Sequence, residues 1–374
     1  MWYKKFRSMF VGFEKCVFLN SAGVSLVSAP VKEAVIKWAE MGECALFEYE
    51  DTITLAKQLS ARLIGASVDG IFISRNTTHG IHTFILGYPW QRGDEVIIGE
   101  CEFPANRLPW LSLRSKGINV KVVPCKDYMV SCEDLIAACS KDTKVIAVSW
   151  VQYVSGYRID IERLGEFCKH RGILLVVDAI QGVGVVPLSV EACNIDWLSA
   201  DGHKWMCGPE GIGLVWTSKR AMSIIEPPCK GWFGVKKPMD FEVFDQEYAA
   251  DASRYQDGSP MMLGIMAYNA ALSMLLDCGI DNIYKRVIAL SSYVIGCVKR
   301  RRWLLLTPEE EAKRAGIVSF KPVGKDVYSC LKALKRHNII CSFRGGWLRL
   351  STHAYNNHTD IDRAFNVLDE VACN

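Results

Sequence analysis

Two ionisable residues in one apolar, glycine-rich segment are the strongest candidates for chemistry. Asp178 ends the apolar run 172–178, and a carboxylate buried there requires a partner, because an unpaired buried charge is costly. Lys204 lies further along, enclosed by His203, Trp205 and nearby glycines. An enclosed lysine has a lowered pKa and can form a Schiff base. Taken singly, the carboxylate could equally cap a helix, and a lone loop lysine is usually solvated.

A carboxylate and a Schiff-base lysine are what pyridoxal 5′-phosphate requires. The lysine would bind the aldehyde carbon, and the carboxylate would pair with the protonated pyridine nitrogen. Residues 76–80, with the hydroxyls of Thr77 and Thr78, lie before a helical pattern and could bind the phosphate, although an ordinary helix N-cap fits them too. Phe103, just after the apolar run 95–99, could cover the ring face or simply belong to the core.

Other cofactor classes are disfavoured. The glycine-rich stretches 182–184 and 208–213 lack the G-x-G-x-x-G pattern with an acidic residue about 20 positions later that a dinucleotide site needs. No Walker loop is present in the sequence. The histidine pairs 79/82 and 353/358 do not match H-E-x-x-H, so we expect no metal.

The composition indicates a globular, cytoplasmic protein. The 374 residues are half apolar, and 44 basic against 41 acidic residues leave a net charge of +3, without the basic excess of a nucleic-acid-binding coat. Fifteen cysteines without a C-x-x-C pair suggest a reducing compartment. The uncharged stretch 258–276 contains Pro260 and Asn269, which favours a buried helix over a membrane span. We therefore expect no binding to nucleic acid or membrane.

Strand-length apolar runs alternate with helix-length patterns over the first half of the chain. The expected strands are 70–74, 95–99, 120–124, 144–150 and 172–178. The expected helices are 31–41, 49–64, 80–88, 107–116, 132–139 and 161–170. This alternation predicts an α/β fold in which helices sandwich a mostly parallel sheet, and ligands bind such sheets at the carboxyl ends of the strands.

A second, smaller α/β domain is expected at the C-terminus. Prolines and glycines interrupt residues 217–260. Helical patterns and short apolar segments follow at 260–278, 282–299, 316–321, 324–337 and 347–351. We expect a large domain over residues 19–259 and a small one over residues 260–374 together with 1–18.

Six motifs occur together in this order. They are FLNSAGVS (18–25), SRNTTHGIH (74–82), IIGECEFPANRLPW (97–110), VVDAIQGVG with DWLSADGHKWMCGPEGIG (176–213), RYQDGSP (254–260) and LRLSTHAYNNHTDIDR (348–363). Together they resemble the class V aminotransferase family of fold-type I pyridoxal phosphate enzymes, which includes cysteine desulfurases, isopenicillin N epimerases and kynureninases. The resemblance implies an aspartate aminotransferase-like fold, pyridoxal phosphate as cofactor and a homodimer.

The resemblance also implies roles around the cofactor ring. Lys204 would be the Schiff-base lysine and the acid/base at the substrate α-carbon. Asp178 would pair with the pyridine nitrogen, and Gln181 would bond the ring 3-oxygen. Phe103 would stack on the ring, where cysteine desulfurases usually have His.

The phosphate and the substrate receive their own residues from the resemblance. Thr77, Thr78 and His203 would hold the phosphate, and Ser259 would reach it from the partner subunit. Arg349 would bind the substrate α-carboxylate as a bidentate partner. Near the cofactor, Tyr153 stands where many relatives have Asn, which leaves its role open.

Two departures from the family pattern limit what can be inferred. Asp201 stands where a phosphate-binding Ser or Thr is often found, and a carboxylate cannot donate to phosphate. The stretch 340–349 is short and lacks the mobile cysteine loop of desulfurases, so we expect Cys341 to be structural.

The resemblance implies an enzyme that acts on the α-carbon of an amino acid after the substrate amine has displaced Lys204. An aminotransferase or a β-lyase is the favoured interpretation, an epimerase is the alternative, and a desulfurase is disfavoured. A degenerate, non-enzymatic binding protein is a further alternative, against which the intact Lys204, Asp178, His203 and Arg349 argue. The substrate and the step after deprotonation stay open.

Overall fold

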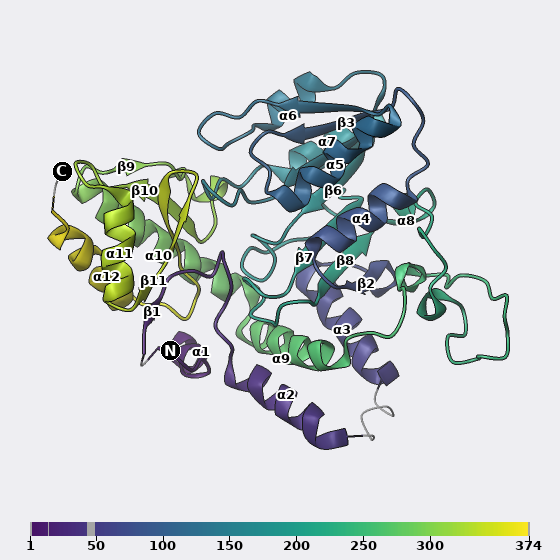
Figure 1. The fold of residues 1–374 in the computed structure, drawn as a ribbon, viewed down its shortest axis with the longest axis horizontal. Coiled ribbons are helices and arrows are strands. Elements are labelled where there is room, and N and C mark those ends of the chain that lie inside the picture. Colours follow the sequence, from purple (N-terminus) through teal and green to yellow (C-terminus); the bar gives the residue numbers. More distant parts are fainter. Residues whose placement is uncertain (1, 14, 43–48, 373–374) are drawn as a thin grey trace.

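The computed structural model describes residues 2–13, 15–42 and 49–372. Met1 and residues 373–374, which we assign to the small domain, lie outside the described residues. The chain forms a large unit around one broad sheet and a smaller unit built mainly from the C-terminal third (Figure 1).

A seven-stranded sheet, in the order β2-β8-β7-β6-β5-β3-β4, forms the large unit. Its strands are β2 (Ile71–Ser74), β3 (Glu95–Gly99), β4 (Asn119–Val123), β5 (Thr143–Ser149), β6 (Leu174–Asp178), β7 (Trp197–Asp201) and β8 (Gly213–Thr217). From β4 to β7 all neighbours are parallel, whereas β8 is antiparallel to both β7 and β2. The prediction of a mostly parallel sheet is confirmed, and β7 and β8 are two strands that the expected set did not include.

Helices cover both faces of this sheet. They are α2 (Ala29–Met41), α3 (Tyr49–Ile64), α4 (Thr77–Gly87), α5 (Leu108–Ser112), α6 (Cys132–Ala138), α7 (Ile161–Arg171), α8 (Lys219–Met222) and α9 (Met262–Cys278). In β6, Leu174 and Val176 face a core shared with α4 and α5, while Leu175 and Val177 face one shared with α3, α7 and α9. Burial on both faces explains why the strands read as continuous apolar runs.

The small unit has an antiparallel sheet in the order β12-β13-β10-β9. Its elements are α10 (Ile280–Arg300), β9 (Leu304–Leu305), β10 (Ile317–Lys321), α11 (Val327–Arg336), β11 (Ile339–Ile340), β12 (Ser342–Arg344), β13 (Trp347–Ser351) and α12 (His358–Glu370). After α1 (Trp2–Ser8), the N-terminal strand β1 (Val17–Phe18) pairs with β11, so both chain ends contribute to this unit.

Two expected helices differ from the structure at their ends. Helix α4 begins at Thr77 rather than at residue 80, because the side chain of Asn76 accepts a hydrogen bond from the His79 backbone N–H (2.9 Å) and caps the helix earlier. The expected helix 107–116 is a short α-helix, α5, followed by a 3₁₀ turn (Leu113–Lys116) that ends at Gly117 with φ 79°. Only a residue that tolerates positive φ suits that end.

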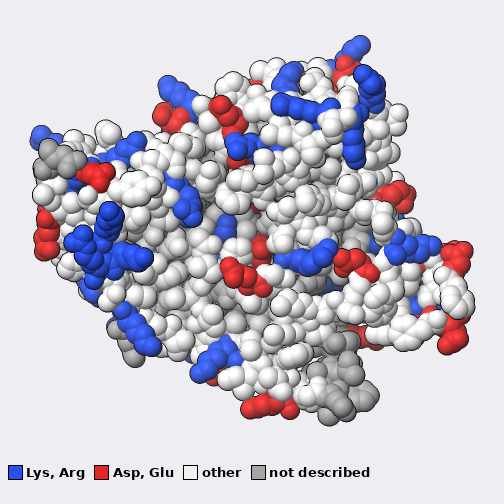
Figure 2. Space-filling view, viewed as in Figure 1, with Lys and Arg blue, Asp and Glu red and all other residues white. Residues whose placement is uncertain are grey.

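Charges of both signs are interspersed over the face of the molecule seen in Figure 2. Among the described residues, no single helix has the length and apolar character to cross a membrane, although α9 and α10, bent by 80° at their junction, meet that test as a pair.

Candidate active site

A cavity of about 250 Å³ opens at the carboxyl ends of β3, β5, β6 and β7, facing the β12–β13 hairpin of the small unit. Nine of the ten site residues proposed from the sequence line it: Thr77, Thr78, Phe103, Tyr153, Asp178, Gln181, His203, Lys204 and Arg349. The tenth, Ser259, lines a neighbouring cavity of about 620 Å³ that shares Asn76 with the first.

Asp178 and Lys204 are both buried and both line this cavity. Asp178 is the last residue of β6, and Lys204 lies in the loop after β7. Burial raises the pKa of Asp178 to about 6, although the Ile180 backbone N–H (3.1 Å) and Lys204 oppose the shift. Burial lowers the pKa of Lys204 to about 8 against the attraction of Asp178. A lysine with this pKa has a substantial uncharged fraction near neutral pH and is a competent nucleophile.

Phe103 lies beside the lysine. The Lys204 Nζ is 5.5 Å from the centroid of the Phe103 ring, and Tyr153 packs edge-on against the same ring at 5.1 Å. Although it is apolar, Phe103 remains 39% exposed, because it projects into the cavity rather than into the core.

A chain of hydrogen bonds fixes the loop that carries Lys204. The Trp205 indole N–H donates to Gln181 Oε1 (2.8 Å), and Gln181 Nε2 donates to the Ala22 carbonyl (3.1 Å). One N–H of the Gln181 amide is left for a ligand. On the other side, the backbone carbonyl of Trp205 lies 3.1 Å from His353 Nε2.

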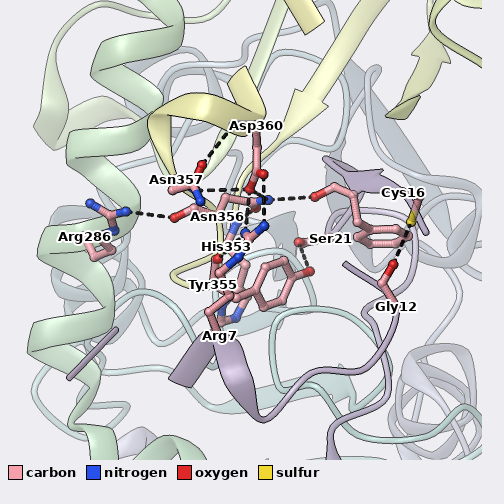
Figure 3. A network of polar contacts seen from close by, with 11 residues as sticks. Arg7, Gly12, Cys16, Ser21, Arg286, His353, Tyr355, Asn356, Asn357 and Asp360 are labelled. Atoms are coloured by element: carbon pink, nitrogen blue, oxygen red, sulfur yellow. Dashed lines mark hydrogen bonds and ion pairs between the residues drawn. The ribbon is translucent and has the colours of Figure 1, made fainter. Parts of the chain in front are cut away.

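His353 belongs to a polar network that joins residues near both chain ends (Figure 3). Its Nδ1 accepts from the Ala354 backbone N–H (2.8 Å), which assigns the ring proton to Nε2 and makes Nε2 the donor to Trp205. Burial lowers the pKa of His353 to about 4, so the ring is neutral. Nearby, the Arg7 guanidinium forms a bidentate pair with Asp360 (2.6 and 3.0 Å), which anchors α1 to α12.

The N-terminus of α4 also lines the cavity. Thr77 Oγ1 accepts from the Asp201 backbone N–H (3.1 Å), which leaves the threonine hydroxyl proton free to donate. Asp201 Oδ1 and His203 Nδ1 lie 3.0 Å apart, but both are buried atoms without a hydrogen-bond partner of good geometry. Helix N-terminal N–H groups together with hydroxyls are suited to binding a phosphate.

These residues fit pyridoxal phosphate. The Lys204 amine donates no hydrogen bond to any described residue. The buried Asp178 carboxylate, the Phe103 ring and the N-terminus of α4 lie in the same cavity. The two unsatisfied buried atoms of Asp201 and His203 indicate that polar groups of a ligand complete the site.

Arg349 lies at the other end of the cavity and is almost fully buried, with 1% of its surface exposed. Its Nε donates to Ser342 Oγ (2.9 Å) and its Nη1 to the Tyr153 carbonyl (2.6 Å), which leaves three of its five N–H donors. It has no carboxylate within ion-pair distance in the described part of the chain. Burial and the neighbouring Arg344 lower its pKa to about 9.

The sequence analysis missed Arg344, which also lines the cavity. It precedes a two-residue turn in which Gly345 (φ 55°) and Gly346 (φ 86°) both adopt positive φ, so Ser342 and Arg344 face Arg349 and Trp347 across a tight hairpin. A Gly-Gly pair between short apolar strands is a hairpin signal. This hairpin signal in the sequence would have shown that Arg344 and Arg349 lie on the same face of the β12–β13 hairpin.

Cys341 precedes this hairpin and does not line the cavity. Burial raises the pKa of its thiol to about 12, so it is protonated at neutral pH and is not a nucleophile. The stretch around it carries no mobile loop, because residues 339–351 are held in β11, β12 and β13.

Comparisons with known proteins identify the family and the fold of this chain. Residues 40–363 match the family model described as Aminotransferase class-V. A probable cysteine desulfurase from Pyrococcus abyssi is 25% identical (96% of this chain, 94% of the relative), and the aminotransferase YcbU from Bacillus subtilis, of uncharacterised activity, is 26% identical (99% and 97%). The cystine C–S lyase C-DES has the same fold, with a TM-score of 0.89 at 19% identity (97% and 100% covered).

Proposed function

Because this chain belongs to the aminotransferase class-V family, we propose that it binds pyridoxal 5′-phosphate through Lys204 and acts on the α-carbon of an amino acid. The observation that carries the proposal is the convergence of Lys204, Asp178 and Arg349 on one cavity. When bound, the cofactor supplies an aldehyde for covalent attachment of amines and a pyridine ring that accepts electrons.

Each residue at the ring end has a distinct task. Lys204 would hold the cofactor aldehyde and would act as the base that accepts the proton of the substrate α-carbon, for which its lowered pKa is suited. The Asp178 carboxylate holds a proton on the pyridine nitrogen. Gln181 donates its free amide N–H to the ring oxygen, and Phe103 covers the ring face.

The phosphate is held by the first turn of α4 and the hydroxyls of Thr77 and Thr78, with His203 beside them. Asp201 Oδ1 and His203 Nδ1 lie 3.0 Å apart without a hydrogen bond of good geometry, so both atoms are available to polar groups of the bound ligand.

The substrate α-carboxylate binds Arg349. The Tyr153 carbonyl and Ser342 fix its guanidinium, and the free N–H groups point to a bidentate carboxylate contact. Burial raises the pKa of the Tyr153 phenol, so it stays protonated and can donate to a leaving group or a reacting carbon on the substrate side chain.

Within the family, we infer an aminotransferase or a β-lyase. The β-lyase interpretation is supported by the likeness to C-DES and by the Tyr153 phenol, a proton donor that lines the same cavity as Lys204. The relatives named cysteine desulfurase keep that activity as an alternative, but it requires a reactive thiol, and no cysteine lines the described cavity. Epimerisation needs a second proton donor on the opposite face of the α-carbon.

Product analysis separates these activities. The purified protein with pyridoxal phosphate and a 2-oxo acid as amino-group acceptor is offered a panel of L- and D-amino acids that includes cysteine and cystine. Keto acid without free ammonia supports an aminotransferase, keto acid with equimolar ammonia supports a β-lyase, and inverted substrate supports an epimerase. Alanine from cysteine, with sulfide released only when a thiol reductant is added, would establish a desulfurase, and no product from any substrate would overturn the enzymatic proposal.

We also infer a cytoplasmic homodimer. The segment 229–261 carries exposed apolar side chains, Trp232, Phe241, Phe244 and Met261, beside the cavity that holds Ser259. A second copy of the chain bound to this segment would bury these side chains and bring Ser259 to the phosphate site of that second copy. The thirteen cysteines in the described residues are all free thiols, which is consistent with a reducing compartment. A monomeric mass by light scattering would contradict the dimer.

A further inference from the structure

Glu102 is a buried carboxylate beside the cavity that the proposed chemistry does not use. It is 2% exposed and lies between the end of β3 and Phe103. Its two oxygens accept hydrogen bonds from the Ser149 backbone N–H (3.0 and 3.1 Å) and from the Ser149 hydroxyl. A buried carboxylate that gathers this many donors fixes their relative positions.

The same carboxylate holds the segment around Phe103 on both sides. Asn106 Nδ2 donates to Glu102 Oε2 (2.8 Å), and Asn106 Oδ1 accepts from the Trp110 indole N–H (3.0 Å). Residues 102 and 106 therefore anchor the short turn that presents the Phe103 ring to the cavity.

Through Ser149, the anchor reaches the strand end beside Asp178. Ser149 is paired with Asp178 in the register of β5 and β6, and the Trp150 N–H donates to the Asp178 carbonyl (2.9 Å). Ser149 therefore links the Glu102 carboxylate to the strand end that carries Asp178.

A second branch of the contacts leads toward the substrate. Gln152 Nε2 donates to Glu102 Oε1 (3.2 Å). The next residue, Tyr153, packs its ring against Phe103 and its carbonyl accepts from Arg349 Nη1.

We propose that Glu102 is a positioning residue that holds Phe103 against the cofactor ring in register with Asp178 and, through Gln152, sets the Tyr153 carbonyl that orients Arg349. This inference rests on the proposed function, because it requires the ring to occupy the cavity. Its alternative is a purely structural role, in which Glu102 stabilises the fold and the ring is indifferent to it.

A double-mutant cycle on cofactor affinity separates the two roles. Pyridoxal phosphate is the probe, and its dissociation constant is measured for wild type, Glu102→Gln, Phe103→Ala and the double variant. Each single variant should weaken binding by about two- to tenfold, the range that one aromatic contact is worth. If Glu102 acts through Phe103, the double variant binds within about twofold of Phe103→Ala alone.

The visible circular dichroism of the bound cofactor gives a second readout, because it reports the orientation of the ring rather than the stability of the fold. The band should change in Glu102→Gln. Glu95→Gln is the matched control. Glu95 is an equally buried carboxylate (3% exposed) that accepts hydrogen bonds from Ser140 and Thr143, and it lies at the first position of β3, the strand that precedes Glu102. It should lower the melting temperature without altering the dichroism or the affinity.

Additive losses in the cycle, or a dichroism band equal to that of wild type, would overturn the proposal. If Glu102→Gln does not fold, Asn106→Ala replaces it in the same cycle with the same criteria, because it removes one of the two anchors of Phe103. Failure of the wild-type protein to bind pyridoxal phosphate would instead contradict the proposed function itself.

Discussion

Replacing Lys204 by methionine should stabilise the apoprotein while destroying its site. In the folded chain the pKa of Lys204 falls from 10.5 to about 8 because the ammonium is buried. The difference corresponds to about 3 kcal/mol of destabilisation when the lysine is charged. This net cost already includes the attraction of Asp178. Lys204 lowers the raised pKa of Asp178, so without the lysine that pKa should rise further and the carboxyl group should be protonated rather than left as a bare charge. We expect Lys204→Met to be more stable than wild type by about 1–3 kcal/mol near neutral pH.

The pH dependence tests the cause. Between pH 8 and 10.5 the unfolded chain binds more protons at Lys204 than the folded chain does, so wild-type stability rises with pH over this range. The advantage of Lys204→Met should therefore shrink between pH 8 and 10.5 and approach zero only above about pH 10.5. Urea unfolding of both apoproteins at several pH values measures it.

The control for this experiment is Lys57→Met. Lys57 is also largely buried but pairs with Asp251 (2.7 Å) and Ser253 (2.9 Å), so its loss should destabilise the protein. A Lys204→Met variant no more stable than wild type, or an advantage that does not change with pH, would refute the reasoning.

Three further predictions follow from the site. Arg349→Ala should raise KM for amino acids by about 10- to 100-fold, because a charge-assisted carboxylate contact is lost, while the cofactor dissociation constant changes little. Steady-state kinetics and a cofactor titration check this. Weakened cofactor binding with an unchanged KM would show that the role is misassigned. Asp178→Asn should keep the covalent attachment at Lys204 but lower kcat by about 100-fold or more, since an amide does not hold a proton on the pyridine nitrogen; full turnover would count against the pairing. Cys341→Ser should leave kcat with cysteine unchanged, because the thiol is buried and protonated; loss of sulfide release would instead favour desulfurase chemistry.

Much of the site could be predicted because it lies at strand ends. Asp178 closes a strongly apolar run, and the carboxyl ends of parallel strands meet at one sheet edge, so its proximity to Lys204 follows from the pattern. Strand β8 escaped prediction because its apolar run is short. Its antiparallel direction also leaves no local pattern, because it depends on packing between β2 and β7.

Two of the residues that sequence reasoning missed, Glu102 and His353, act through long-range contacts. Glu102 looks like a loop carboxylate, and its role depends on Ser149 and Gln152, which lie 47 and 50 positions away in the chain. His353 likewise reaches the Lys204 loop across 148 positions. Neither spacing leaves a local pattern. The assignment of Ser259 to a partner's site stays a prediction, because it concerns a second chain.

The most direct measurement is to identify the covalent site. The protein is incubated with pyridoxal phosphate, reduced with borohydride, digested and analysed by mass spectrometry. A cofactor-derived mass on the peptide containing Lys204, lost in Lys204→Met, is the predicted result. A modification spread over surface lysines, or concentrated on another residue while residue 204 stays unmodified, would contradict the central claim.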